Sequence, residues 1–257
     1  MNKTLPFLLL IFSLSISAQN LSGKAYYKSN TNSGKDYSNL PEENRLRFEK
    51  MNKELYEKSY MLTFNNNESI YKEEEILKET SMYMQGVLAA MESYSIQSIY
   101  KNHDTHRIME EREFLGKKFL IDDTLPKLDW QLEKESKQIG DYIVFKATAT
   151  RKVDLNDYRA QALKNNDSIK KQKKAYFMIT AWYTPQIPIS NGPDEYSGLP
   201  GLILELNVGR TTFLCHKIIL SPANDIIIKQ PKSGQVVTFD EFDKIAEAKK
   251  KELKNKF

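Results

Sequence analysis

Asp122 and Asp123, with Asp129 further along the chain, have the types and spacing best suited to acid–base chemistry. Two carboxyl groups, one acting as an acid and one as a base or nucleophile, carry out glycoside hydrolysis. Acidic residues are also common in turns, where their side chains hydrogen-bond the backbone. The sequence favours such turns, and a hydrolase that uses an acidic pair at Asp122/Asp123 is kept as the alternative.

Histidine and methionine suggest a second chemistry, the handling of metal ions. His103 and His106 stand three positions apart, but they flank a polar turn, and a metal site needs three or four converging ligands. The methionine-rich stretch from Met82 to Met91 offers thioether sulfur for a soft metal, yet no histidine or cysteine lies beside it. A solvated turn and a gap-filling loop are therefore favoured. A metal-handling protein is the other alternative.

The sequence contains no established catalytic motif. It has no GxSxG, HExxH or Walker sequence, and no GxGxxG after a strand. Cys215 is the sole cysteine, so the chain forms neither an intrachain disulfide nor a cysteine metal site. His216 is its neighbour in an expected strand and faces the other side, which argues against a Cys–His nucleophile. We predict no catalytic residues, no metal ligands and no cofactor.

The segment from Trp182 to Ile203, WYTPQIPISNGPDEYSGLPGLI, is rich in proline and glycine. Proline fixes a backbone dihedral and glycine permits crowded positions, so this loop is expected to be rigid. A connection of this length without regular structure is usually functional or strongly packed. Its aromatic residues Trp182, Tyr183 and Tyr196 form either a ligand-binding wall or a clamp on the sheet, and the clamp is favoured.

Short strands are expected to position these residues. Strands with connections of two to four residues predict an antiparallel meander from Ser98 onward. They are expected at Ser98–Lys101, His106–Leu115, Phe119–Ile121, Asp129–Ser136, Asp141–Arg151 and Ala175–Tyr183. Upstream, Lys24–Lys28 and Ser59–Phe64 are typical of strands, and Leu40–Glu54 has helical spacing.

The end of the chain predicts a hairpin and a helix. Leu202–Val208 and Thr211–Leu220 flank Gly209-Arg210, which suits a tight turn that sets Leu206 opposite Phe213. Thr238 and Glu241 form a capping box at the start of an amphipathic helix. The expected fold is mainly β (α+β): a curved antiparallel β-meander, half-barrel-like, with short helical insertions and a C-terminal amphipathic helix.

The first residues are typical of an export signal. Residues 1–18 combine Lys3, a short apolar run and small residues before Ala18, so we expect a signal peptide cleaved after Ala18. The run is too short for a spanning helix, and no stable membrane anchor is expected. Residues 19–257 are expected to form a single domain, with insertions near 73–97 and 153–174. The formal net charge of +4 over 257 residues, with basic residues only in local runs, argues against nucleic-acid binding.

Several ordered segments resemble the GLPGLI family, also called the Porph_ging family. Upstream, the resemblance includes Ile121–Asp123, Leu128, Trp130, Ile139, Tyr142 and Lys146–Thr148. The family motif and possible binding rim comprise Trp182, Tyr183, Pro185, Pro188, Gly192, Pro193, Tyr196, Gly198, Leu199, Pro200, Gly201, Leu202 and Ile203. The sequence departs from the family pattern at Val144 and in the Lys-rich insertion.

The resemblance covers roughly Ser98 to Pro222 and implies an exported protein of Bacteroidota-type bacteria, periplasmic or secreted, with a shared fold. It implies no chemistry. By fold analogy alone, the sheet resembles the half-barrel of periplasmic lipoprotein carriers. We therefore expect a non-enzymatic cell-envelope binding protein for a protein partner or an apolar ligand on its curved sheet, with the loop shaping one rim.

Overall fold

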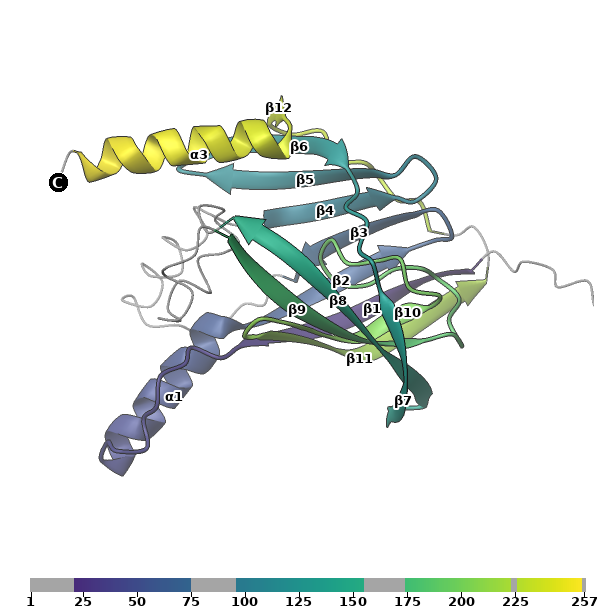
Figure 1. Cartoon of the computed structure of the whole chain (residues 1–257), viewed down its shortest axis with the longest axis horizontal. Coiled ribbons are helices and arrows are strands. Elements are labelled where there is room, and N and C mark those ends of the chain that lie inside the picture. The colour runs from purple at the N-terminus through teal and green to yellow at the C-terminus, as the bar shows by residue number, and fades with distance from the viewer. Residues whose placement is uncertain (1–20, 75–95, 155–173, 223–225, 256–257) are drawn as a thin grey trace, which may run out of the picture.

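The computed structural model describes residues 21–74, 96–154, 174–222 and 226–255 (Figure 1). The strands are β1 (Leu21–Thr31), β2 (Glu57–Phe64), β3 (Glu68–Glu73), β4 (Ile96–Asn102), β5 (Arg107–Phe114), β6 (Lys117–Thr124), β7 (Gln131–Ile139), β8 (Tyr142–Asp154), β9 (Lys174–Thr184), β10 (Leu202–Val208), β11 (Thr211–Pro222) and β12 (Gln235–Val237). Helix α1 (Glu42–Tyr56) lies between β1 and β2, and α3 (Phe239–Lys254) follows β12.

All twelve strands belong to one open, curved sheet (Figure 1). Strands β1 to β6 form one antiparallel meander and β7 to β11 form a second. The two are joined where β1 pairs antiparallel with β11, and β12 adds to β6 in parallel. The prediction of a mainly β, half-barrel-like antiparallel sheet is confirmed. The edges of the sheet are β7 and β12.

The expectation that the strands around Phe119–Ile121 and Asp129–Ser136 are neighbours in one meander is wrong. They are β6 and β7, which lie at opposite ends of the strand order. Figure 1 shows the connection between them crossing in front of the sheet. Its side chains Leu125, Leu128 and Trp130 pack against the main core. The short connection from β6 to β7 therefore crosses the concave face of the sheet. The burial of its apolar side chains against the core stabilises this path.

The predicted hairpin and C-terminal helix are confirmed. Leu206 pairs with Phe213 across the turn, and Gly209 has the positive φ of 59° that such a turn requires. At the start of α3, the Glu241 backbone N–H donates to Thr238 Oγ1 at 3.3 Å, and the Thr238 N–H donates to Glu241 Oε2 at 2.8 Å. This reciprocal pair is the predicted capping box. Strands β3 and β12 have no counterpart among the predicted elements.

The main core lies within the curve of the sheet. Tyr27, Leu62 and Phe64 from the first meander are fully buried there, together with Ile187 and Leu199 of the loop between β9 and β10. A second, smaller core packs α3 against β5, β6 and β12. The Pro/Gly loop thus fills much of the concave face, where the sequence predicted that it would shape one rim.

Some expectations concern residues that the structure does not describe. The proposed signal peptide and most of both insertions lie outside the described residues, and the single-domain assignment stays a prediction. Within the described ranges, neither helix is long and apolar enough to cross a membrane.

Candidate functional site

Lys101 on β4 holds the loop between β9 and β10 inside the curve. Its ammonium group donates to the backbone carbonyl oxygens of Gly192 at 2.8 Å, Asp194 at 2.7 Å and Tyr196 at 3.4 Å. The side chain is fully buried. A buried ammonium group is costly unless its protons are bonded, and these carbonyls accept from it. The contact fixes the middle of the loop to the opposite wing of the sheet.

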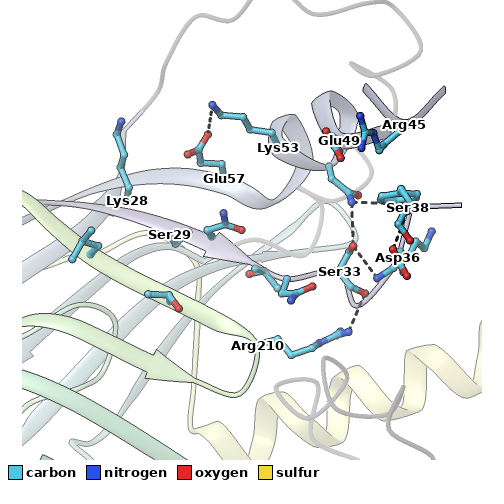
Figure 2. Close-up of a pocket in the computed structure, with 18 residues that line it drawn as sticks. Lys28, Ser29, Ser33, Asp36, Ser38, Arg45, Glu49, Lys53, Glu57 and Arg210 are labelled. Atoms are coloured by element: carbon cyan, nitrogen blue, oxygen red, sulfur yellow. Dashed lines mark hydrogen bonds and ion pairs between the residues drawn. The ribbon is translucent and has the colours of Figure 1, made fainter. Parts of the chain in front are cut away.

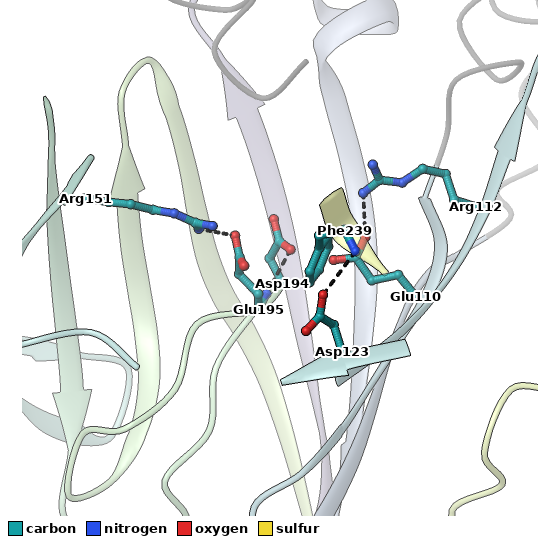
Figure 3. Close-up of polar contacts among 7 residues, drawn as sticks. All are labelled: Glu110, Arg112, Asp123, Arg151, Asp194, Glu195 and Phe239. Carbon is teal, nitrogen blue, oxygen red and sulfur yellow. Dashed lines mark hydrogen bonds and ion pairs between the residues drawn. The ribbon is translucent and has the colours of Figure 1, made fainter. Parts of the chain in front are cut away.

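Arg151 and Glu195 anchor the same part of the loop from the other side. Figure 3 shows the Arg151 guanidinium reaching from β8 to the Glu195 carboxylate, with which it forms an ion pair. The neighbouring half-buried Asp194 has a positive φ of 56°, which is uncommon for a residue with a side chain. Charged side chains from both halves of the sheet, on β4 and on β8, therefore bind residues 192–196 of the loop.

Burial shifts the pKa values of Lys101, His103 and Asp194 in the direction that favours the uncharged form of each. Desolvation lowers the pKa of Lys101 to about 7 and that of His103 to about 4. It raises the pKa of Asp194 to about 6, with the nearby Glu195 charge as the second cause. Perturbed groups often mark functional sites. Here Lys101 donates to loop carbonyls and Glu195 is paired with Arg151, so these charged groups hold the loop in place. We call the contact of Lys101 with the loop carbonyls the latch.

The glycines of the motif permit close backbone contacts. A Cβ atom on Gly201 would lie 2.2 Å from the Thr184 carbonyl oxygen, which leaves no space for a side chain. Gly198 has a positive φ of 96° and lies under Trp130, whose indole N–H donates to the Ser197 carbonyl at 2.9 Å. Close packing thus explains Gly201, and the backbone conformation explains Gly198.

The predicted site residues divide into a buried and an exposed set. Tyr183, Gly192, Pro193, Tyr196, Leu199, Gly201, Leu202 and Ile203 are buried, whereas Pro185, Pro188, Gly198 and Pro200 are exposed and Trp182 is half-buried. Trp182 and Tyr183 are adjacent in β9 and face opposite sides, and Lys137 Nζ lies 4.2 Å from the Trp182 ring centroid. The three aromatic residues thus form no common wall. A rim of exposed positions stays a prediction.

Asp122 and Asp123 are not an acidic pair. Asp122 accepts two hydrogen bonds from Arg107, at 2.7 Å from Nε and 2.5 Å from Nη2, which lower its pKa. Asp123 Oδ2 instead accepts the Phe239 backbone N–H at 3.0 Å, at the start of α3 (Figure 3). Consecutive strand residues point to opposite faces, so these carboxylates cannot share a substrate. The acidic pair named in the hydrolase hypothesis is therefore not formed by these two residues, and the hypothesis itself stays untested.

Because Asp122 and Asp123 act separately, their substitutions are expected to be additive in stability. Asp122→Asn removes a partly exposed ion pair and should lower the free energy of unfolding by less than about 1 kcal/mol. Asp123→Asn weakens the contact that starts α3 and should cost about 1 kcal/mol. Urea unfolding of both single variants and the double variant tests this, and a coupling energy above about 0.5 kcal/mol would contradict the assignment.

His103 contacts the loop, and Cys215 is buried. His103 Nε2 lies 3.2 Å from the Asn191 side-chain amide in the loop. Across the described ranges, no group of three or more His, Cys, Asp or Glu side chains converges to hold a metal ion. Cys215 is buried, which raises the pKa of its thiol to about 12. The methionine-rich stretch lies outside the described residues, so its part in the metal hypothesis stays untested.

Sequence reasoning missed a second buried ion pair. Glu110 and Arg112 on β5 are both almost completely buried, and the Arg112 guanidinium lies 4.9 Å above the Phe242 ring of α3. Figure 3 shows the contact between the two side chains. Both lie between Ile108 and Phe114 on the same face of β5. The sequence did not indicate their burial, because charged residues are usually exposed.

Residues 130–205, which span β7 to β10 and include the latched loop, match the family model described as "Protein of unknown function (Porph_ging)". We call residues 130–205 the GLPGLI region. GLPGLI is the alternative name of that family, so the resemblance seen in the sequence is confirmed. No curated protein matches the sequence.

One solved structure, a crystal form of PNGF-II, supports the fold of the chain. PNGF-II in a C2 crystal form is 13% identical over 88% of this chain and 32% of that chain, with a TM-score of 0.51. Its P21 form gives a TM-score of 0.45 at 15% identity over 81% and 29% of the two chains. LprF from Mycobacterium bovis gives 0.27 at 10% identity over 84% and 91%. The chain spans about a third of the PNGF-II chain, and this likeness shows the fold alone.

The GLPGLI region also contains an exposed apolar surface that the motif did not reveal. Leu132 on β7 and Ile143 and Phe145 on β8 are 60%, 47% and 36% exposed. Leu132 pairs with Ala147 of β8, the strand that also carries Ile143 and Phe145. We call these three residues the edge patch, because β7 is an edge of the sheet. The sequence could have indicated this surface, because these apolar residues stand among the polar residues of the β7–β8 hairpin.

Proposed function

We propose that the protein is an exported, non-enzymatic cell-envelope protein that binds a protein partner through the edge patch. Its support is the exposure of Leu132, Ile143 and Phe145 on the last hairpin of an open sheet, inside the GLPGLI region. Exposed apolar side chains that gather on one face often mark a surface for another protein. Aromatic residues such as Phe145 are favoured at the centre of such contacts.

The loop contributes the neighbouring rim of this surface. The Ile143 backbone N–H donates to the Gln186 side-chain oxygen at 2.9 Å, so the exposed start of the loop adjoins the patch. The Phe145 ring lies 6.3 Å from the ring of buried Tyr183. The end of β9 and the start of the loop therefore adjoin the patch, and Lys101 fixes the loop further along, at Gly192 and Asp194. A rigid surface loses less entropy on binding than a mobile one.

An apolar ligand inside the curve is less well supported. Ile187, Ile189 and Leu199 of the loop occupy the concave face and are almost completely buried. A ligand would have to displace the loop from its bonds to Lys101 and expose these side chains to water. This cost favours a protein partner on the outside over an apolar ligand within.

Strand addition at β7 is also less favourable than side-chain contact. The pairing of β7 with β8 is irregular between Leu132 and Ser136, and the intervening residues are Glu133, Lys134 and Glu135. Bulges and charges on an edge strand discourage pairing with another strand. The partner is therefore expected to contact the apolar side chains of the patch.

Photo-crosslinking in the native bacterium tests this proposal. A photoreactive residue at Ile143 should give one dominant crosslinked protein, identifiable by mass spectrometry, because this position lies in the patch. The same residue at Thr150, which is exposed on the opposite face of β8, is the matched control. Phe145→Asp should reduce the crosslink about tenfold or more, since it removes an apolar anchor.

The cell fraction that contains the crosslink reports on export. A crosslink confined to the cytoplasm, equal yields from the two positions, or a yield unchanged by Phe145→Asp would each contradict the proposal.

A further inference from the structure

A polar groove lies between α1, the segment after β1 and the turn between β10 and β11 (Figure 2). Its volume of about 1050 Å³ is large enough to hold a ligand bigger than a single sugar. Its walls come from residues 28–38, from one side of α1, and from Arg210 and Thr212. We call it the α1 groove. It shares no residue with the edge patch.

Cationic side chains outnumber carboxylates in the α1 groove, whose lining includes Asp36, Glu49 and Glu57 against five lysines and arginines. Lys28, Lys35, Arg45 and Arg210 line it, and among the described residues none of them forms an ion pair. Lys53 also lines it and lies 3.8 Å from Glu57, so this pair is largely neutral. The excess positive charge favours a ligand with acidic groups.

Hydrogen bonds hold the groove in shape. The Asn52 side-chain amide of α1 donates to Ser33 Oγ and to the Tyr37 hydroxyl, both at 3.1 Å. Arg210 Nη1 donates to the Ser33 carbonyl at 3.0 Å. The Tyr37 ring stacks on Phe48 of α1, with ring centroids 5.4 Å apart. These contacts tie the segment after β1 to both neighbouring walls, so the groove exists before any ligand arrives.

Two arginines of the groove retain unused hydrogen-bonding capacity. The Nε atoms of Arg45 and Arg210 are buried and have no hydrogen-bond partner in the described structure. A guanidinium group binds carboxylate or sulfate through charge-assisted hydrogen bonds. Because both Nε atoms are shielded from solvent, an acidic group in the groove would contact the terminal Nη atoms of these arginines.

The remaining lining of the groove suits sugar hydroxyl groups. Asn30, Asn32, Thr31 and Thr212 provide amide and hydroxyl groups that both donate and accept hydrogen bonds. An acidic peptide would be better matched by apolar pockets for its side chains, and Leu214 is the sole aliphatic residue of the lining. We propose that the α1 groove binds an anionic oligosaccharide, whose acidic groups contact the cations and whose hydroxyls contact the amides.

Isothermal titration with a defined sugar tests this inference on the full chain. The probe is an oligogalacturonate of four residues, and its methyl-esterified, uncharged form is the matched ligand. The acidic sugar should bind, and the ester should bind about tenfold more weakly or not at all, because it cannot form charge-assisted hydrogen bonds. No binding of the acidic sugar, or equal binding of the ester, would overturn the proposal.

Paired variants locate the site. K28Q/R45Q removes two cations that make no side-chain hydrogen bond in the described structure, and it should weaken binding about tenfold or more. K117Q/K118Q removes the same charge from exposed positions outside the groove and should leave binding unchanged. Equal effects of the two double variants would refute a specific site. Tighter binding of tetraglutamate than of the sugar would assign the groove to acidic peptides and overturn the proposal.

Discussion

Replacing Lys101 by methionine is expected to lower the free energy of unfolding by about 2–4 kcal/mol and to loosen the loop between β9 and β10. Methionine keeps the length and the apolar stem of the side chain but donates no hydrogen bond. The carbonyls of Gly192, Asp194 and Tyr196 would then be left without this donor. Removing the buried charge also relieves its desolvation cost, which keeps the expected loss well below the sum of three broken bonds.

The pH dependence of stability separates the charge of Lys101 from its packing. Burial lowers the pKa of folded Lys101 to about 7, whereas the unfolded value is near 10.5. Between these values the unfolded chain binds the proton and the folded chain does not. Rising pH therefore stabilises the wild-type protein, by at most about 1.4 kcal/mol per pH unit. Below pH 7 both states hold the proton, and the cost of burying the charge is constant.

Urea unfolding of wild type and K101M at pH 8, 9 and 10 measures both effects. The stability difference between them should grow with pH, because the variant lacks the titrating group. This range lies above the pKa values of Asp194 and His103, which are about 6 and about 4. K72M, at an exposed position of β3, is the matched control and should change stability by less than about 0.5 kcal/mol. A K101M variant as stable as K72M would refute the latch.

Local signals in the sequence were enough for part of the fold. The turn at Gly209-Arg210 and the capping box at Thr238 and Glu241 act over a few residues, so the β10–β11 hairpin and α3 could be predicted closely. The pairing of β1 with β11 joins opposite ends of the chain, for example Ser22 with Ser221. No local pattern specifies such a contact, and none shows that β6 and β7 lie far apart in the strand order.

The candidate site shows a similar division. The sequence marked the loop as rigid and packed, and the buried positions of Tyr196 and Leu199 agree with a clamp. It gave no sign of the latch, because a lysine such as Lys101 is expected at the surface unless its partners are known. Those partners are backbone carbonyls, which every residue type carries. Likewise, Asp122 and Asp123 form a pair in sequence, but the alternation of a strand separates them in space.

The structure also changes the meaning of the GLPGLI motif. Its glycines and leucines are needed to fill the curve of the sheet, as shown by the burial of Leu199, Leu202 and Ile203. Packing therefore accounts for the buried residues of the motif. Two surfaces that packing does not explain are the edge patch and the α1 groove. Function is better sought there, because the apolar side chains of the patch are exposed and the groove has an excess of cationic side chains.

Gly201→Ala is expected to lower the free energy of unfolding by about 3 kcal/mol or more, the largest effect of any one-methyl change in the motif. The added Cβ would lie 2.2 Å from the carbonyl oxygen and 2.6 Å from the carbonyl carbon of Thr184. Both are backbone atoms of a fully buried residue at the end of β9. Relief of the overlap requires β9 and the loop to separate, which would strain the nearby hydrogen bond from Leu202 N–H to the Ile187 carbonyl.

Two further glycines make this prediction specific to close backbone approach. Gly192→Ala would bring Cβ to 2.8 Å from a methyl carbon of Ile203, a side chain that can shift, so a smaller loss of about 1–3 kcal/mol is expected. Gly116→Ala has open space but a positive φ of 74°, so only backbone strain of about 1–2 kcal/mol applies. Urea unfolding should rank Gly201→Ala as the most damaging of the three. If it matches Gly116→Ala, contact with Thr184 is not the reason for glycine at this position.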